Sequence, residues 1–404
     1  MNKLYIYGFA IIIGIISGYF NIPLVADTAK FISEVFIRVF KCISMPVVSL
    51  SVIVALACYG DGKNTSRIWK KALQYTTITT LTAASVAAVL YYVINPPSVP
   101  HLSQVSSDVP VSATGYTQYF LEIIPDSISK AFIDHKVLSV LLISVIFGLS
   151  VRYISETKIK DTLTTCIQGV HSIFFAITKF IVRILPIGMF GFVSVSVKEL
   201  QHGMNLQGMG KYFIVIICAN LVQGLIVLPT WLASKGINPI KAFKGMSPAL
   251  SVAFFAKSSS GALPVTIQSA EENLHVDPKV SRFVLPLCTT INMNGCAAFI
   301  FTTVIYVMQN YGVNIDLITV LTWIVIASLA AIGNAGVPMG CFFLSASLLS
   351  SMNIPMPLLG IILPIYSVID MLETALNVWS DSCVALTINK KIASSSTQPS
   401  SDDH

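Results

Sequence analysis

Eight long apolar stretches divide this chain, and they constrain its fold more than any other feature. They lie at 5–22, 32–58, 72–94, 134–153, 164–197, 211–234, 281–309 and 356–388. A helix of about 20 apolar residues crosses the hydrocarbon core of a bilayer. Continuous runs of this length exclude a membrane β-barrel, whose strands alternate over about ten residues. The pattern therefore predicts an all-α polytopic membrane protein.

Composition supports the same class of protein. The 404 residues are 54% hydrophobic and only 11% charged, whereas soluble domains carry about 25% charged residues. So few charges exclude a soluble enzyme, a disordered chain and a nucleic-acid-binding module. The sequence shows no nucleophile–base pair, zinc-binding HExxH or phosphate-binding loop. We therefore expect no enzymatic activity and no cofactor.

The cysteines do not form a recognisable framework. None of the eight belongs to a CxxC pair, and most lie inside apolar runs: Cys42, Cys58, Cys166, Cys218, Cys288, Cys296, Cys341 and Cys383. We predict buried, small apolar side chains rather than disulfides or a metal site.

Two further apolar segments, 242–272 and 317–352, are interrupted at their centres. The interruptions read KSSSGALP (257–264) and AIGNAGVPMG (331–340). Each segment is long enough for two half-spans but too short for two full spans, so both are predicted to be re-entrant helical hairpins. A kinked helix is the alternative that a single interruption would favour. Paired interrupted segments are typical of the binding site of a secondary transporter.

Positive charges predict the topology. Lys and Arg gather at 59–71, 152–161 and 235–244, whereas 95–133 holds only Lys130. This alternation places the N-terminus in the cytoplasm. It also opens the first hairpin to the inside and the second to the outside, as inverted repeats would.

The last apolar run carries three acids, Asp370, Glu373 and Asp381, with Thr374 and Asn377 between them. In a helix these five residues fall within an arc of roughly 100°. Charges inside a membrane are expensive and usually line a cavity or a substrate pathway. Bracing by a basic residue is the alternative, but three acids exceed that need.

Two other clusters complete a predicted site. The string TTINMNG (289–295) offers neutral oxygens, and a helix interrupted there would release carbonyls that suit Na⁺. The serines at 258–260 stand where a half-helix would begin, and free N–H groups there bind a carboxylate. A carboxylate at the hairpin tips and an ammonium at an aspartate describe an α-amino acid.

These motifs resemble the dicarboxylate/amino acid:cation symporter family. The resemblance rests on KSSSGALPVTI, LPLCTTINMNG, AAIGNAGVPMG and DMLETALNVWSD, in that order, with MPVV (45–48) and NPP (95–97) before them. It implies eight transmembrane helices plus two re-entrant hairpins related by inverted repeats. It also implies a homotrimer in membrane lipid and an elevator mechanism, with no nucleic-acid partner.

The resemblance also divides the chain into scaffold and transport domains. The expected parts are scaffold helices at 1–70, a transport-domain helix at 71–97, an extracellular loop at 98–133, scaffold helices at 134–200, the rest of the transport domain at 201–390, and a disordered cytoplasmic tail at 391–404. The expected location is the plasma membrane, which is the inner membrane in a Gram-negative bacterium.

Roles follow by position in the family motifs. Asp370 would hold the substrate ammonium, and Thr374 and Asn377 would contact the substrate. The α-carboxylate would lie between the backbones of Ser258, Ser259, Ser260, Ala335, Gly336 and Val337. Candidate cation ligands form three groups: Asn292 and Asp381 with Cys288 and Asn377; Thr290 and Met293 with Ala331, Ile332 and Asn334 of the second hairpin; and Thr79, Thr80 and Asn294.

Three positions depart from the family pattern. Asn294 replaces an Asp, which keeps an oxygen but loses the charge, so we predict a weak or absent cation there and a reduced coupling stoichiometry. Cys296 replaces a Thr. Glu373 replaces the Arg of members that carry acidic substrates, and like charges in a low dielectric disfavour such substrates.

Two interpretations of Glu373 stay open. Ionised, it would pair with a cationic substrate side chain; protonated, it would bind a neutral polar one and could couple protons. Lys257 could neutralise either acid, or could pair with Glu373 alone.

The leading hypothesis is a symporter that moves a neutral polar or cationic amino acid with Na⁺ or H⁺. A dicarboxylate or glutamate is the alternative substrate. A passive channel or anion conductance, and a transporter-like sensor, are the alternative functions.

Overall fold

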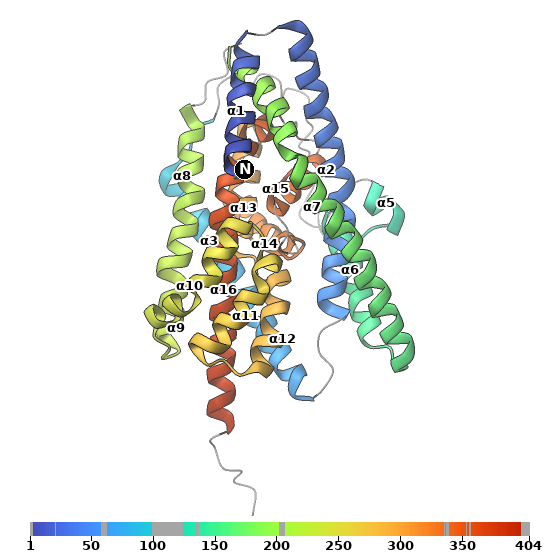
Figure 1. Ribbon diagram of the computed structural model, residues 1–404, viewed down its shortest axis with the longest axis vertical. Coiled ribbons are helices and arrows are strands. Elements are labelled where there is room, and N and C mark those ends of the chain that lie inside the picture. The colour runs from blue at the N-terminus through green and yellow to red at the C-terminus, as the bar shows by residue number, and fades with distance from the viewer. Residues whose placement is uncertain are drawn as a thin grey trace, which may run out of the picture.

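The computed structural model describes residues 3–20, 22–57, 63–98, 124–133, 137–201, 207–334, 336, 339–352, 354 and 357–396, and within these ranges it contains helices and no strands (Figure 1). The helices are α1 (Lys3–Phe20), α2 (Pro23–Ala57), α3 (Lys63–Ile94), α5 (Ile128–Ile133), α6 (Val137–Arg152), α7 (Thr157–Gln201), α8 (Gln207–Val222), the π-helical turn η2 (Gln223–Val227), α9 (Leu228–Ser234), α10 (Pro239–Ala256), α11 (Ser259–Leu274), α12 (Pro278–Ile291), α13 (Asn294–Asn310), α14 (Leu317–Ile332), α15 (Gly340–Ser351) and α16 (Pro357–Ser396). The predicted all-α class is confirmed.

Several helices are suited to a membrane. Among the described residues, three helical stretches are long and apolar enough to cross one: Ile68–Ile94, Met209–Ser234 and Pro278–Asn310. Other helices expose large apolar side chains; on α1, for example, Phe9 and Tyr19 are each 66% exposed. Water would make such a surface costly, whereas lipid does not.

The interruption in the first hairpin is shorter than predicted. Helix α10 ends at Ala256 and α11 begins at Ser259, so Ser260 and Gly261 are helical. Lys257 takes the left-handed conformation that ends α10 (φ 53°), and the Ser258 hydroxyl caps α11 by accepting the Gly261 N–H at 3.0 Å. Two residues are therefore enough to break the helix.

The second interruption and the break in TTINMNG lie where the sequence predicts them. Helix α14 ends at Ile332 and α15 begins at Gly340. Between α12 and α13, Asn292 and Met293 leave the helical conformation, with ψ angles of 75° and 68°. The last carbonyls of α12 are thereby freed from the regular helical pattern.

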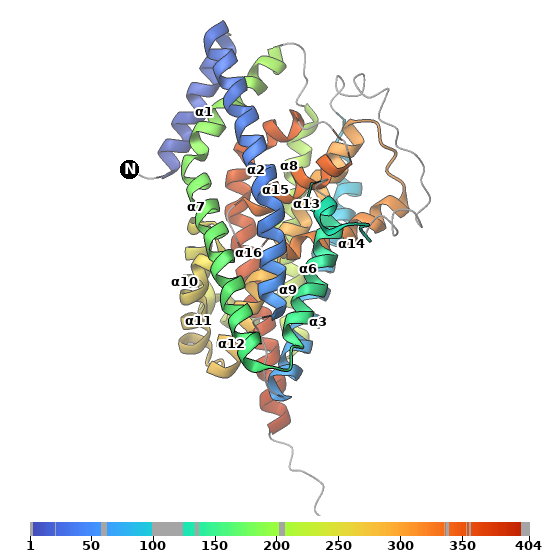
Figure 2. The ribbon, with the colours of Figure 1, turned by 90° about the vertical axis from the view of Figure 1, so that its right-hand side faces the viewer.

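The helices pack as two neighbouring groups. Helices α1, α2, α6 and α7 lie against one another, and α3 and α8 join α10–α13 around α16. Figures 1 and 2 show the long α7 beside α1 and α2, with α16 running through the interior. Except for Leu372 and Ala375, every residue of α16 from Ile369 to Ile388 is buried. The α16 acids are therefore surrounded by protein on all sides and do not lie on a water-exposed face of the helix.

A close approach of α7 to α2 generates a first prediction. A Cβ atom on Gly191 would lie 2.8 Å from the Ala29 carbonyl oxygen and 3.0 Å from the Ser33 nitrogen, both backbone atoms of α2. We expect Gly191→Ala to destabilise the protein by about 1–3 kcal/mol, because the two helices must separate. Thermal unfolding in detergent measures this loss.

Gly169 provides the matched control on the same helix. A Cβ atom added to Gly169 would have no other atom within 4 Å, so Gly169→Ala should hold or raise the melting temperature through its better helix propensity. Equal melting temperatures for the two variants would contradict the predicted packing of α7 on α2.

Candidate functional site

The two hairpins and the broken helix meet at the middle of α16. The Ser258 hydroxyl donates to the Gly336 carbonyl at 3.0 Å, which joins the two hairpin tips. A Cβ atom on Gly336 would lie 2.7 Å from the Thr289 carbonyl oxygen, next to the break after α12. From the second hairpin, the Met339 N–H donates to Asp370 Oδ2 at 3.2 Å. The two hairpin tips thus meet each other and the break after α12, and the second hairpin also reaches Asp370.

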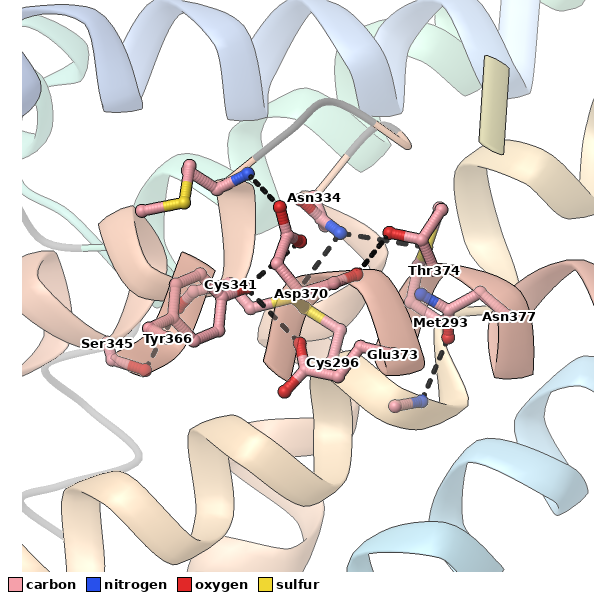
Figure 3. The surroundings of a disulfide bond; sticks show 12 residues. Met293, Cys296, Asn334, Cys341, Ser345, Tyr366, Asp370, Glu373, Thr374 and Asn377 are labelled. Atoms are coloured by element: carbon pink, nitrogen blue, oxygen red, sulfur yellow. Dashed lines mark hydrogen bonds between the residues drawn. A yellow bond between two sulfur atoms is a disulfide. The ribbon is translucent and has the colours of Figure 1, made fainter. Parts of the chain in front are cut away.

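Asp370 and Glu373 share a single hydroxyl group (Figure 3). The Tyr366 oxygen lies 3.4 Å from Asp370 Oδ1 and 3.2 Å from Glu373 Oε2. All three residues are buried, and Glu373 is only 1% exposed. Because one hydroxyl proton serves one acceptor at a time, the pair lacks a donor. Glu373 Oε1 has no hydrogen-bond partner within the described residues.

Glycine lets α13 approach this carboxylate pair. A side chain on Gly295 would lie 2.8 Å from Glu373 Cα and 2.9 Å from Asn220 Oδ1. That amide oxygen also has no partner in the described part of the chain. Two unsatisfied acceptors therefore flank Gly295, and buried acceptors are costly without a donor.

Sequence reasoning missed Tyr366. Its spacing of four and seven positions before Asp370 and Glu373 is the signal that would have found it, because such residues share a helix face. Phe299 and Phe342 pack on its ring, with centroids 4.3 and 5.7 Å away, and hold the hydroxyl between the acids.

Lys257 reaches α16 one turn before Asp370. Its Nζ donates to the Ser367 carbonyl and hydroxyl oxygens, each at 2.6 Å. Glu373 takes its hydrogen bond from Tyr366 instead. The alternative in which Glu373 pairs with Lys257 is therefore not the arrangement found.

Thr374 and Asn377 are both buried and both engaged. The Thr374 hydroxyl donates to the Asp370 carbonyl at 2.7 Å. Asn377 Oδ1 accepts the Gly295 N–H at 2.8 Å, which satisfies a donor at the start of α13. Asn377 thus fastens α16 to the broken helix.

The hairpin tips are only partly described. Ser258 and Ser259 are buried and Ser260 is half-buried. Gly336 has φ +63°, the left-handed region that favours glycine. Ala335 and Val337, the other predicted tip residues, lie outside the described residues.

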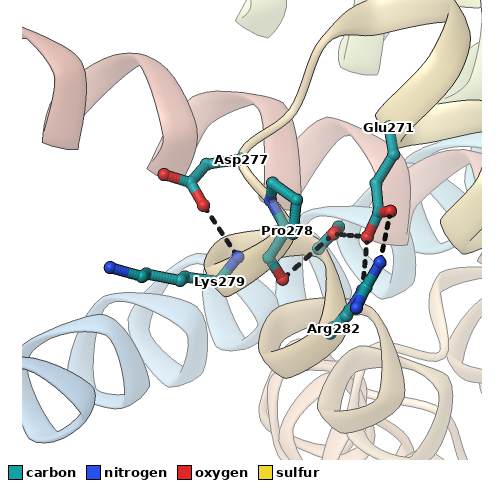
Figure 4. Close-up of polar contacts among 6 residues, drawn as sticks. Glu271, Asp277, Pro278, Lys279 and Arg282 are labelled. Carbon is teal, nitrogen blue, oxygen red and sulfur yellow. Dashed lines mark hydrogen bonds and ion pairs between the residues drawn. The ribbon is translucent and has the colours of Figure 1, made fainter.

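Polar contacts hold the base of the first hairpin (Figure 4). Arg282 donates to both carboxylate oxygens of Glu271 at 3.0 Å, and the Ser281 hydroxyl donates at 2.6 Å. These bonds hold the pKa of Glu271 below its usual range. Asp277 caps α12 by accepting the Lys279 N–H at 2.8 Å. The start of α12 is thereby fixed to the end of α11.

The first group of candidate cation ligands contains a bare carboxylate oxygen. Asn292 Nδ2 donates to Asp381 Oδ1 at 2.9 Å, whereas Asp381 Oδ2 has no partner within the described residues. Asp381 is 0% exposed, and an unpaired buried charge is strongly unfavourable. The Cys288 carbonyl accepts the Asn292 N–H at 2.8 Å, as in a regular helix. A cation beside Oδ2 would satisfy the charge.

The second group surrounds Asn334. Its Nδ2 faces Met293 Sδ at 3.7 Å and Cys341 Sγ at 3.4 Å, and its Oδ1 has no partner in the described part of the chain. The Ala331 carbonyl accepts the Asn334 N–H, and Ile332 ends α14. The Thr290 hydroxyl donates to the Leu287 carbonyl within α12.

The third group forms a closed network. The Thr79 hydroxyl donates to Asn292 Oδ1 at 3.0 Å, and Asn294 Nδ2 donates to the same oxygen at 2.9 Å. Gln223 and Ser380 also belong to this network, and sequence reasoning missed both. Thr80 Oγ1 lies nearby in α3 and has no partner among the described residues.

The candidate cation ligands do not form a transition-metal site. No cluster of three or more His, Cys, Asp or Glu side chains that could hold a metal ion occurs within the described residues. Neutral oxygens with a single carboxylate suit a hard monovalent cation better than a soft metal.

The cysteine prediction is wrong for one pair. Cys296 and Cys341 form a disulfide with Cα atoms 5.3 Å apart (Figure 3). Cys42 and Cys166 are exposed rather than buried. Neither fact could be read from the spacing, because cysteine connectivity is set by the fold. The disulfide joins the first turn of α13 to the first turn of α15, beside Asp370 and Glu373.

We expect this disulfide to be detected directly. Peptides that contain Cys296 and Cys341 should remain joined in non-reducing mass spectrometry and separate after reduction. Cys341→Ser should lower the free energy of unfolding by about 2–4 kcal/mol. Peptides with Cys288 and Cys383, both buried and free, are the internal control. Two separate peptides before reduction would contradict the assignment.

Comparison with known proteins identifies the family. The family model of the sodium:dicarboxylate symporter family matches residues 5–391. The chain is 28% identical to a proton/sodium-glutamate symport protein of Geobacillus stearothermophilus, over 94% of this chain and 92% of the relative. It is 26% identical to the proton/glutamate-aspartate symporter of Escherichia coli, over 95% and 91%. It is 24% identical to the neutral amino acid transporter B(0) of Bos taurus, over 89% and 72%. The chain therefore belongs to the sodium:dicarboxylate symporter family.

Proposed function

We propose that this protein is a secondary active symporter that moves an amino acid across the plasma membrane together with Na⁺ or H⁺. Family membership supports the class, since the named relatives are sodium- or proton-coupled carriers or amino acid transporters. The contact between the two hairpin tips, with Asp370 bonded to the second, supports a ligand that has a carboxylate and an ammonium group. The fold places these groups in the interior rather than on a surface, which suits transport.

The substrate side chain is proposed to be neutral and polar, or cationic. The observation that carries this is Glu373 Oε1, a buried carboxylate oxygen without a partner in the described residues. Asn220 Oδ1, which faces Gly295 as the Glu373 Cα does, is a second acceptor that lacks a donor within the described residues. An acidic side chain would add negative charge to a place that already needs a donor. Glutamate, the substrate named for two relatives, is therefore the less favoured alternative.

The missing donor has two sources. A cationic substrate would donate to an ionised Glu373. Alternatively, protonated Glu373 would donate one O–H to an acceptor and would carry no charge. Uptake and release of this proton could then drive transport. The shared Tyr366 hydroxyl supports the second source, because one proton more would satisfy both acids.

A coupling cation is proposed at Asp381. Its Oδ2 is buried and unpaired within the described residues, whereas Oδ1 is held by Asn292. Charge neutralisation by Na⁺ would bind α16 to the break after α12, where the substrate also binds. This shared boundary would couple the two ligands.

We further propose an elevator movement in a homotrimer. The group of α1, α2, α6 and α7 would be the static scaffold, and the helices around α16 would move past it. The tight glycine contacts of α7 with α1 and α2 support a rigid scaffold. Passive conductance and ligand sensing without transport are the competing functions.

Reconstituted liposomes test the proposal. An imposed inward Na⁺ or H⁺ gradient should make the protein accumulate a labelled amino acid above its external concentration. Flux that never exceeds equilibrium would indicate a channel. Saturable binding without uptake would indicate a sensor.

The charge at position 373 gives a specificity prediction. Glu373→Arg should weaken binding of the native amino acid by at least about tenfold and create binding of aspartate, because the sign of the site is reversed. Binding is measured by thermal shift with each amino acid, since a ligand stabilises by mass action. Glu373→Gln distinguishes the two sources of the missing donor: it should preserve binding of a neutral substrate and abolish binding of a cationic one. Unchanged selectivity in both variants would refute the role of Glu373.

The glycine at the tip of the second hairpin, Gly336, gives a prediction about amino acid affinity. Gly336→Ala should lower amino acid affinity by at least about tenfold, because its Cβ would meet the Thr289 carbonyl and push the hairpin tip away. Gly312→Ala is the control: Gly312 also has positive φ, +79°, but a Cβ atom added there would have no other atom within 4 Å. It should show only backbone strain of about 1–2 kcal/mol and normal affinity. Equal affinity losses in the two variants would contradict contact between the tip and α12.

A further inference from the structure

A closed amide network occupies the third predicted cation position. It joins α3, η2, α13 and α16 through Thr79, Gln223, Asn292, Asn294 and Ser380. Each of these side chains is at most 5% exposed. Because the network is buried, most of its donors and acceptors are expected to satisfy one another.

One end of the network is fixed by a carboxylate. Asp381 Oδ1 can only accept, so the Asn292 group 2.9 Å away must be its NH₂. The Asn292 oxygen then points the other way, to the Thr79 hydroxyl and to Asn294. Asn294 must therefore also present its NH₂ to that oxygen.

The other end is fixed by a backbone carbonyl. Gln223 Nε2 lies 3.2 Å from the Thr79 carbonyl oxygen, which can only accept. The same NH₂ donates to Asn294 Oδ1 at 2.7 Å. Both ends thus dictate the same orientation of Asn294, with its oxygen toward Gln223 and its NH₂ toward the cation position.

The Asn294 NH₂ group faces three oxygens. They are Asn292 Oδ1 at 2.9 Å, Ser380 Oγ at 2.8 Å and Thr79 Oγ1 at 3.5 Å. The family resemblance assigns Thr79, Thr80 and residue 294 to the third cation, and it assigns Asn292 to the first. Here a positive amide edge lies among them, so these residues do not fit a bound cation.

The backbone brings Gln223 to this place. It begins η2, a single π-helical turn between α8 and α9, and such turns often mark functional sites. The Trp379 indole donates to the neighbouring Gly224 carbonyl at 3.0 Å, which holds the turn against α16. Gln223 Oε1 and Thr80 Oγ1 have no partner within the described residues, but neither carries a charge.

We propose that Asn294, oriented by Gln223, replaces the third coupling cation with its own amide hydrogens. Gln223 is the positioning residue, because it prevents Asn294 from turning its oxygen toward the cation position. The protein then operates with one coupling cation fewer than a relative with Asp at this position. This inference rests on the proposed function, since it concerns the ions that drive the symporter.

Asn294→Asp tests the proposal by restoring the carboxylate. Purified protein without amino acid is titrated with Na⁺ at constant ionic strength, with choline as the replacement ion. An added site increases stability with the logarithm of Na⁺ concentration. Asn294→Asp should melt below the wild type in choline and recover in Na⁺, with a slope larger by about one bound ion.

Gln223→Leu is a second variant that adds no charge. It removes one of the two constraints on the orientation of Asn294 and leaves the one from Asn292, so a smaller gain in Na⁺ dependence is expected. Gln268→Leu is the control, because Gln268 is an exposed amide of α11 that bonds only Glu272 among the described residues. Its Na⁺ dependence should equal that of the wild type.

The outcomes separate this inference from the proposed function. Wild-type slopes in folded Asn294→Asp and Gln223→Leu would overturn the inference, even if amino acid transport is found. A wild type that neither binds nor accumulates any amino acid would overturn the proposed function. The ligand-free titration would still report whether residue 294 controls Na⁺ binding.

Discussion

Three buried carboxylates on one helix set the demand that the rest of the structure meets. Asp370, Glu373 and Asp381 lie in the fully enclosed part of α16, where an unpaired charge is strongly unfavourable. Protein groups satisfy only part of that demand. Asp370 receives Met339 N–H, and Asp381 receives Asn292 on one oxygen. The remaining oxygens of Glu373 and Asp381 lack partners within the described residues, so a proton, a substrate or a cation must complete them.

Broken helices are the means by which partners reach these acids. In an intact helix the N–H and carbonyl groups bond to one another. A break at membrane depth leaves some of them free for other partners, at a place that protein encloses. Two of the three breaks are secured by a side chain: Ser258 caps α11, and Asn377 holds the start of α13 through Gly295. The interruptions in the sequence and the acids of α16 are thus two halves of one arrangement.

Sequence patterns predicted the breaks and the acids because both follow from local rules. Gly, Pro and small polar residues interrupt a helix wherever they cluster, and acids in an apolar run are conspicuous. The partners were harder to foresee. Tyr366 resembles any aromatic residue of a buried helix, and Gln223 is an amide in an apolar run with no motif around it. The pairing of Cys296 with Cys341 depends on how the second hairpin folds back onto α13, which no local pattern contains.

The disulfide between Cys296 and Cys341 would affect two movements differently: the sliding of the transport helices and the opening of the second hairpin. Cys296 belongs to α13, which packs on α16, and Cys341 belongs to α15, which packs mainly on α13. In the proposed elevator both cysteines would move together with the moving helices. The disulfide would therefore not oppose the sliding of these helices past the scaffold. It would resist only the peeling of α15 away from α13. A reducing agent would then change how long the ligand stays bound, but it would not change how far the moving helices slide.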